Sequence, residues 1–80
     1  MENNKELINN IEKLHTTEMG IEWIKKNLEL DTKDVVKWCK SKIIKSDNIY
    51  KKEKNWYVIC KDYIITINSH SYTIITAHKI

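Results

Sequence analysis

The sequence predicts an α+β domain, with two to three N-terminal helices packed on one face of a four-stranded antiparallel β-meander. Three observations lead to this fold class. Apolar residues recur at helical spacing up to about residue 45, β-branched and aromatic residues dominate the segments after it, and short polar turns separate those segments. A chain of 80 residues forms a single domain, residues 1–80, whose small core makes it marginally stable alone.

Helices are expected over about residues 3–14, 17–29 and 32–45. Thr17 precedes an acidic first turn, where its hydroxyl can accept a hydrogen bond from an unpaired amide and so begin the second helix. Asp31 or Thr32 can cap the third helix in the same way. The single glycine, Gly20, costs about 1 kcal/mol inside a helix relative to alanine. We therefore expect close packing or a ligand against that turn, the alternative being a tolerated glycine.

Strands are expected over about residues 48–52, 56–60, 63–68 and 72–78. A two-residue turn at Lys61-Asp62 sets three opposing pairs: Cys60 with Tyr63, Val58 with Ile65, and Trp56 with Ile67. A two- or four-residue loop around Ser69 and His70 would add two more: Ile67 with Tyr72, and Ile65 with Ile74. A three-residue loop would shift the register by one residue and place each side chain of the last strand on the opposite face of the sheet.

This register leaves one face of the sheet open, with His70 at its rim. The open face is expected to carry Tyr57, Ile59, Ile64, Thr66, Asn68, Ser71, Thr73, Ile75 and Ala77. A stackable tyrosine, hydroxyls and nearby lysines suit a single-stranded nucleic acid. The alternatives are an ordinary solvated sheet face, or a homodimer that covers its isoleucines.

Charge is unevenly distributed along the chain. Residues 1–31 hold four lysines against seven acids, and residues 32–80 hold ten against four. All 14 basic residues are lysine, which favours point-charge attraction to a polyanion over bidentate phosphate recognition. No membrane span and no secretory signal are expected, and both cysteines fall in apolar segments typical of buried thiols. These features predict a cytoplasmic protein.

Several motifs recur in known proteins. They are the runs LHTTEMG at 14–20, IKKNL at 24–28, VVKWC at 35–39 and NWY at 55–57, with the ending at 65–79. Together they resemble a family of small bacterial and phage proteins of unknown function. More loosely, helices followed by a four-stranded meander with a Thr-Ala-His ending resemble the superfamily of barnase, RelE-type toxins and colicin-type tRNases. That resemblance covers the order of elements and one short motif.

The looser resemblance implies a metal-independent endoribonuclease of toxin type, acting by transesterification at the RNA 2′-hydroxyl. Histidine can move either proton, and the candidates are His78, His15 and His70. The register above puts His78 on the helix side, where it could meet His15. Lys25 or Lys79 would supply positive charge to stabilise the transition state, and Ser71, Thr73 or Thr76 would bind the phosphate oxygens. The absence of arginine puts the phosphate clamp of RelE-type toxins in doubt.

No cofactor is expected. The histidines and cysteines show no paired zinc-ligand spacing, and one glycine cannot build a phosphate-binding loop. The rival to the ribonuclease hypothesis is a non-catalytic protein-binding module, such as a phage or mobile-element inhibitor of a host defence protein. The partner is thus expected to be RNA or a host protein.

Overall fold

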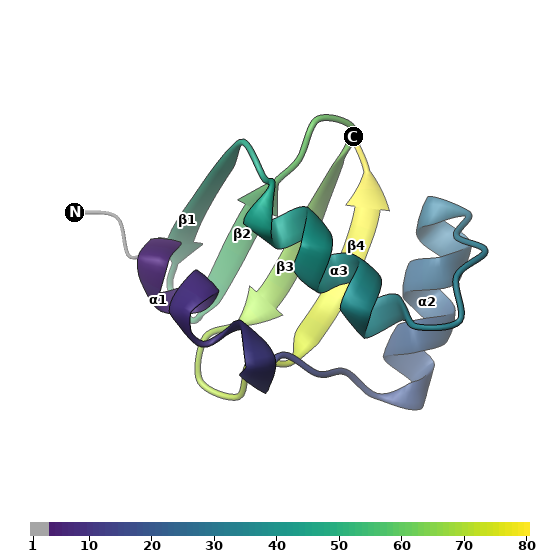
Figure 1. Ribbon diagram of the computed structural model, residues 1–80, viewed down its shortest axis with the longest axis horizontal. Helices are drawn as coiled ribbons and strands as arrows, with labels where there is room; N and C mark the ends of the chain where they lie inside the picture. Colours follow the sequence, from purple (N-terminus) through teal and green to yellow (C-terminus); the bar gives the residue numbers. More distant parts are fainter. Residues whose placement is uncertain (1–3) are drawn as a thin grey trace.

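The computed structural model describes residues 4–80 and has an α+β architecture (Figure 1). Its elements are α1 (Asn4–Asn9), the 3₁₀ helix η1 (Ile11–Lys13), α2 (Glu18–Leu28), α3 (Val35–Ile44), β1 (Asn48–Lys52), β2 (Asn55–Ile59), β3 (Tyr63–Asn68) and β4 (Ile74–Lys79). The strands form one antiparallel sheet in the order β1-β2-β3-β4, so the predicted meander is confirmed.

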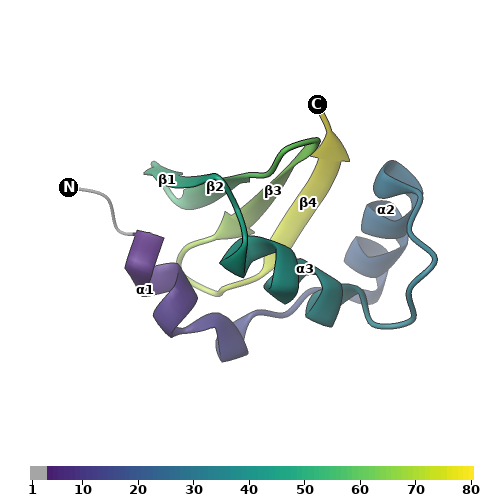
Figure 2. The ribbon, with the colours of Figure 1, turned by 45° about the horizontal axis from the view of Figure 1, so that its top comes forward.

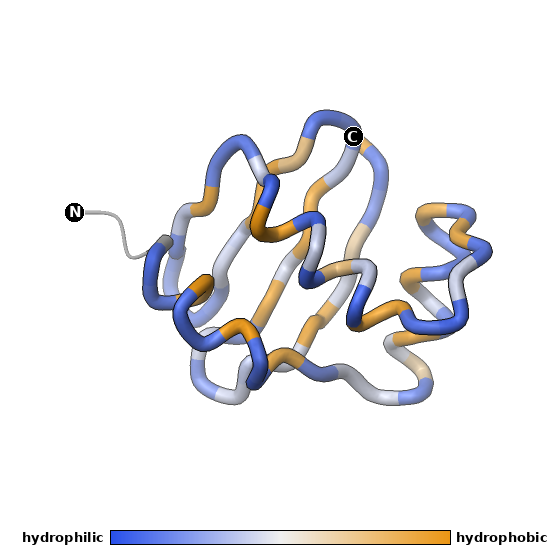
Figure 3. The backbone as a smooth tube through the Cα atoms, viewed as in Figure 1, coloured by the Kyte–Doolittle hydropathy of each residue, from blue (hydrophilic) through white to orange (hydrophobic). Residues whose placement is uncertain are grey.

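The helices cover one side of the sheet. Figure 2 shows α3 and the α1–η1 segment beneath the strands, while α2 lies alongside β4. The core between these layers is built on fully buried side chains, among them Leu7, Ile24, Cys39, Trp56, Ile65 and Ile67. In Figure 3 the apolar stretches of the central strands lie behind α3, and hydrophilic turns form the rim. Among the helices of residues 4–80, none covers the opposite face of the sheet.

The first predicted helix, 3–14, is wrong beyond Asn9. The side chain of Asn10 donates a hydrogen bond to the carbonyl of Glu6, 2.8 Å away, and this local bond replaces continued helix. The short 3₁₀ helix η1 follows, and residue 3 lies outside the described residues. The break lets Leu7 and Leu14 both reach the core, although they belong to separate elements.

The second helix begins where its cap predicts. Thr17 is the N-cap, and its hydroxyl oxygen accepts a 3.0 Å hydrogen bond from the Gly20 amide. Glu29, in the left-handed region at φ 54°, ends α2 one residue earlier than predicted. The close packing expected at Gly20 is found, because a Cβ there would clash with the hydroxyl oxygen of Thr16.

The third helix starts later than predicted. Asp34, rather than Asp31 or Thr32, is its N-cap and accepts a 3.0 Å hydrogen bond from the Lys37 amide. The Thr32 hydroxyl instead accepts from the Asp34 amide at 3.3 Å, which shapes the loop ahead of the helix. The helix then buries Val35, Cys39 and Ile43, an i, i+4, i+8 stripe.

The β2–β3 hairpin has the predicted register. Val58 pairs with Ile65 and Trp56 with Ile67. The Cys60 amide donates to the Tyr63 carbonyl at 2.9 Å, which closes the two-residue turn at Lys61-Asp62. Strand β2 runs one residue earlier than predicted, over 55–59.

The predicted register of the last strand is wrong. Ile67 pairs with Ile74 instead of Tyr72, and Ile65 pairs with Ala77 instead of Ile74. Five residues form the β3–β4 loop, and a bulge at Ile75 shifts the register between Thr66 and Ile67.

The bulge also changes which face the last strand presents. Side chains alternate along a strand, so Ile74 and Ala77, three apart, would face opposite ways without an extra residue. Both are instead buried, at 1% and 0% exposed. Ala77 therefore moves from the predicted open face to the core, and His78 moves from the predicted helix side to the open face.

Candidate functional site

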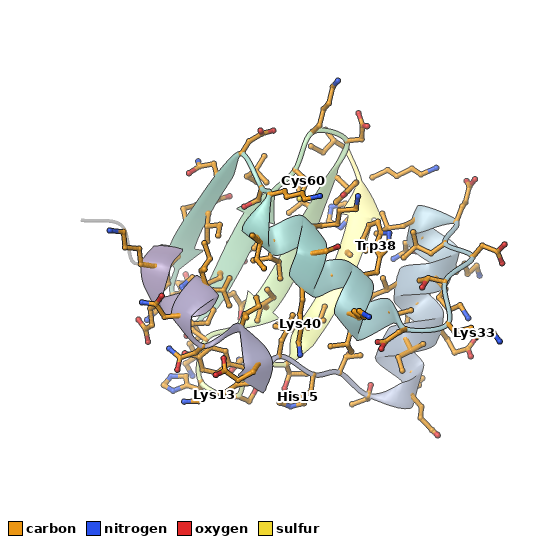
Figure 4. All side chains as sticks on the ribbon, viewed as in Figure 1. Lys13, His15, Lys33, Trp38, Lys40 and Cys60 are labelled. Carbon is orange, nitrogen blue, oxygen red and sulfur yellow. The ribbon has the colours of Figure 1, made fainter. Side chains whose placement is uncertain are left out.

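His15 is held against the start of β4. Its amide donates to the Tyr72 carbonyl at 3.1 Å, and its carbonyl accepts from the Ile74 amide at 2.8 Å. These bonds make a parallel bridge between His15 and Thr73, beside η1 at the edge of the sheet (Figure 4). The imidazole of His15 is exposed, while the backbone amide and carbonyl of His15 are both held by hydrogen bonds.

A chain of side-chain hydrogen bonds runs from His15 to the end of β3. The Nε2 atom of His15 lies 3.1 Å from the Thr73 hydroxyl, which lies 2.7 Å from that of Ser71. The Ser71 hydroxyl also lies 3.2 Å from Oδ1 of Asn68. We call His15, Thr73, Ser71 and Asn68 the His15 cluster.

The backbone determines which nitrogen of His15 carries the proton. Its Nδ1 atom lies 2.9 Å from the carbonyl oxygen of Lys13, and a carbonyl can only accept. In the neutral ring Nδ1 is therefore the donor and Nε2 accepts from the Thr73 hydroxyl, so the single hydrogen of the Ser71 hydroxyl is shared between the Thr73 oxygen and Oδ1 of Asn68. The atom that faces the hydroxyls is thus the one able to take up a proton.

The loop that carries the hydroxyls is tightly built. Oδ1 of Asn68 accepts hydrogen bonds from the amides of His70 and Ser71, at 2.9 and 3.0 Å. Tyr72 adopts φ 60°, a conformation that costs a non-glycine residue about 1–3 kcal/mol. Packing of its ring on Trp56, with centroids 5.2 Å apart, helps offset this cost. Burial, and to a smaller extent Glu6, raises the pKa of Tyr72 above its usual value.

Rows of paired residues cross the open face of the sheet. One row joins all four strands through Tyr50, Tyr57, Thr66 and Thr76. The two tyrosine rings stack with centroids 5.3 Å apart and planes at 22°. A second row holds Asn48, Ile59, Ile64 and His78, and a third holds Lys52, Asn55 and Asn68. Asn68 belongs to this third row and to the His15 cluster, so the two regions are continuous.

Lysines gather near the His15 cluster. The Ser69 amide donates to the Lys54 carbonyl at 2.8 Å, which holds the β1–β2 turn against the β3–β4 loop. Lys54 comes from this turn and Lys52 ends β1, and Lys13 lies with its Nζ 5.5 Å from the centroid of the Tyr72 ring. These lysines can attract anions, and Glu53 in the same turn and Glu6 near Tyr72 offset part of their positive charge.

The structure brings together some of the predicted site residues. His15, Asn68, Ser71 and Thr73 meet in the His15 cluster, and His70 belongs to the same loop. Tyr57 and Thr66 lie on the open face as predicted, although Thr66 is only 7% exposed.

Other predicted site residues lie elsewhere. His78 pairs with Ile64, five residues along β4 from Thr73, or about 16 Å at the usual strand rise. It does not meet His15, so that pairing is wrong. Lys79 forms a 3.3 Å ion pair with Glu29, and Lys25 is half-buried on α2.

Two contributors to this surface were missed by sequence reasoning. The alternation of β1 and the β1–β2 register could have placed Tyr50 opposite Tyr57, because both follow from local pattern. The position of Lys13 beside Tyr72 has no local signal, since it depends on how η1 packs on the sheet.

The two cysteines do not belong to this surface. Cys39 and Cys60 are buried free thiols, as predicted. Burial raises the pKa of Cys39 to about 12, with a smaller contribution from Cys60. Burial also raises the pKa of Cys60. Neither thiol is ionised at neutral pH, so neither is an activated nucleophile.

Residues 8–78 match a family described as a protein of unknown function (DUF3781). The chain belongs to this family. This family match agrees with the predicted resemblance to small proteins of unknown function, and the family description assigns no activity. No curated protein and no solved structure matches the chain, so the looser resemblance to ribonucleases gains no support there.

Two further properties concern residues 4–80. None of the helices described there is long and apolar enough to cross a membrane. Within the same residues, no group of three or more His, Cys, Asp or Glu side chains is arranged to hold a metal ion.

Proposed function

We propose that this protein binds single-stranded RNA on its open sheet face and cleaves it at the His15 cluster, as a metal-independent endoribonuclease of toxin type acting in the cytoplasm. One observation carries the proposal. The row of Tyr50, Tyr57, Thr66 and Thr76 lies next to the row of Lys52, Asn55 and Asn68, and Asn68 also belongs to a cluster that contains a proton-accepting histidine nitrogen.

The binding half of the proposal follows from the chemistry of the open face. The stacked rings of Tyr50 and Tyr57 offer a platform for bases, worth about 1–3 kcal/mol per stacked base. The amides of Asn55 and Asn68 and nearby hydroxyls can hydrogen-bond to base edges and the ribose. Lysines at the rim contact phosphates without sequence preference, so affinity falls steeply as salt rises.

The cleavage half assigns roles to two histidines. His15 accepts the proton of the ribose 2′-hydroxyl through Nε2, and that oxygen attacks the phosphorus. The bond from phosphorus to the 5′-oxygen breaks, and His70 donates a proton to the leaving oxygen. The products are a 2′,3′-cyclic phosphate and a free 5′-hydroxyl. Lysines of this end, such as Lys13, stabilise the extra negative charge of the transition state.

The test separates binding from cleavage. Purified protein is incubated with mixed cellular RNA and with tRNA in EDTA, and compared with His15→Ala and His78→Ala. We expect cleavage that His15→Ala abolishes and His78→Ala largely retains, because only His15 belongs to the cluster. Cleavage that depends equally on both histidines, or no cleavage at all, contradicts the assignment.

Binding is measured separately, by fluorescence anisotropy with a short labelled single strand. Tyr57→Ala should weaken binding about tenfold or more, consistent with the loss of one stacked base. Lys40→Ala, on α3 and therefore on the helix side of the sheet, is the matched control and should leave the affinity for RNA unchanged. Failure to bind RNA at low salt would remove the whole proposal.

The second candidate function is a non-catalytic module that binds a host protein, such as an inhibitor of a defence protein. The wide separation of His15 and His78 favours this binding function, because the two histidines do not form an acid–base pair. RNA that is neither bound nor cut would support this second function. A homodimer formed through the open sheet face stays a third proposal, and it would compete with RNA for that face.

A further inference from the structure

The outer face of α2 carries apolar side chains that the fold leaves uncovered. Met19 is 70% exposed and Trp23 is 53% exposed, although they lie on successive turns of one helix. With Glu22 and Lys26 they line an open groove of about 320 Å³. We call these four residues the outer face of α2.

The outer face of α2 points away from the core. The opposite side of α2 buries Gly20, Ile24 and Leu28 in the core. Within residues 4–80 the one ion pair joins Lys79 and Glu29, so neither Glu22 nor Lys26 is paired. The ammonium of Lys26 lies 5.8 Å from the centroid of the Trp23 ring instead.

We propose that the outer face of α2 binds the same face of a second copy of this chain. A symmetric dimer needs a surface that is complementary to itself. In two antiparallel helices related by a two-fold axis, a residue on one side of the axis lies opposite the residue that is equally far beyond the axis on the other helix. With the axis between Glu22 and Lys26, each acid faces the lysine of the other copy, and this occurs twice. Trp23 lies beside the axis, between the two charge pairs, and meets its own copy there, while Met19 extends the apolar contact beyond Glu22.

Other ways of joining two copies are less favourable. Strand pairing at β4 is blocked, because Asn27 and Thr16 donate hydrogen bonds to the edge carbonyls of Ala77 and Ile74, at 3.2 and 2.9 Å. The β1 edge bears the exposed Lys51, a common obstacle to strand pairing. The exposed acids Glu18 and Glu22 also make the outer face of α2 a poor surface for RNA.

The size of the surface sets the strength of the dimer. The eleven residues of α2 span only about 16 Å, and one side of so short a helix is too small to bury the roughly 800 Å² per partner that is typical of stable interfaces. We therefore expect a dimer that forms reversibly at high micromolar concentration. It leaves the sheet face free, so this proposal does not depend on RNA binding.

The test is a charge exchange measured by sedimentation equilibrium at low salt, from about 10 µM to about 1 mM protein. Glu22→Lys and Lys26→Glu should each weaken the dimer about tenfold, because each puts like charges opposite each other twice. The double variant Glu22→Lys, Lys26→Glu should restore dimerisation to within about threefold of the original. Both substituted positions are exposed on the helix surface, so folding is preserved, and circular dichroism verifies this.

Two matched variants complete the test. Trp23→Ala should abolish the dimer, and Tyr57→Lys, on the open sheet face, should leave it intact. A protein that stays monomeric throughout the concentration range overturns the proposal. So does a dimer that Tyr57→Lys disrupts, or one in which the double variant is no better than the single variants.

Discussion

Replacing Gly20 with alanine should destabilise the protein, against the usual preference of helices. An alanine inside a helix ordinarily stabilises by about 1 kcal/mol relative to glycine. Here its methyl group would clash with the hydroxyl oxygen of Thr16. That hydroxyl donates a 2.9 Å hydrogen bond to the Ile74 carbonyl, so it cannot move aside without breaking a contact between the start of α2 and β4.

The magnitude follows from comparing these effects. Breaking the Thr16 bond leaves the partly buried Ile74 carbonyl without this donor, which costs about 1–3 kcal/mol. Local strain of the first turn adds to this, because the capping hydroxyl of Thr17 lies 3.3 Å from the same Cβ position. After subtracting the helical gain, we expect Gly20→Ala to lower the free energy of unfolding by about 1–2 kcal/mol.

A double-variant cycle isolates the cause. Thr16→Ala removes the clashing atom, so in that background Gly20→Ala should become neutral or stabilising by up to about 1 kcal/mol. Urea unfolding followed by circular dichroism measures all four proteins, and Met19→Ala, an exposed neighbour, serves as the control. A stabilising Gly20→Ala in the original protein would refute the reasoning, as would equal effects in the two backgrounds.

Three further outcomes are expected. Thr73→Val removes the hydroxyl between Ser71 and His15 and should cost about 1 kcal/mol of unfolding free energy, whereas Thr32→Val removes one hydrogen bond instead of two and should cost less; equal losses in urea unfolding would contradict the ordering. Asn27→Ala uncovers the Ala77 carbonyl at the β4 edge and should lower stability by about 1 kcal/mol and increase light scattering on storage; unchanged scattering would show that the edge needs no cover. Burial raises the pKa of Cys39 from 9.0 to about 12, so the folded thiol stays protonated where the unfolded thiol ionises. Stability is therefore full below about pH 9 and falls as pH rises toward 12, and Cys39→Ala should flatten that decline in urea unfolding at pH 7 to 10.

Features that depend on neighbours in sequence were predictable. The cap at Thr17 and the turn at Lys61-Asp62 each involve residues only a few positions apart. Because side chains alternate along strands, that turn also determined the pairing of Val58 with Ile65. The predicted end of the first helix was wrong because the Asn10 side chain donates a hydrogen bond to the Glu6 carbonyl, which competes with the helical backbone pattern. Hydrophobic periodicity does not detect such a bond.

The candidate site was half predictable. The hydroxyls and Asn68 were recognised because their density exceeds what a strand pair needs. The partner of Thr73 was not, because His15 reaches it through a parallel bridge between segments 58 residues apart. No local pattern records that contact, which depends on how the segment after η1 lies along the start of β4.

The sequence by itself determined the α+β class, the order of the elements and the pairing of β2 with β3, because local periodicity and a tight turn specify them. Only the tertiary structure decided the face of β4. Ile74 and Ala77 are both buried, and alternation cannot bury both without the extra residue at Ile75. Whether burial of both outweighs a broken ladder depends on what packs against β4, and α2 provides that packing. The same bulge places His78 on the open face.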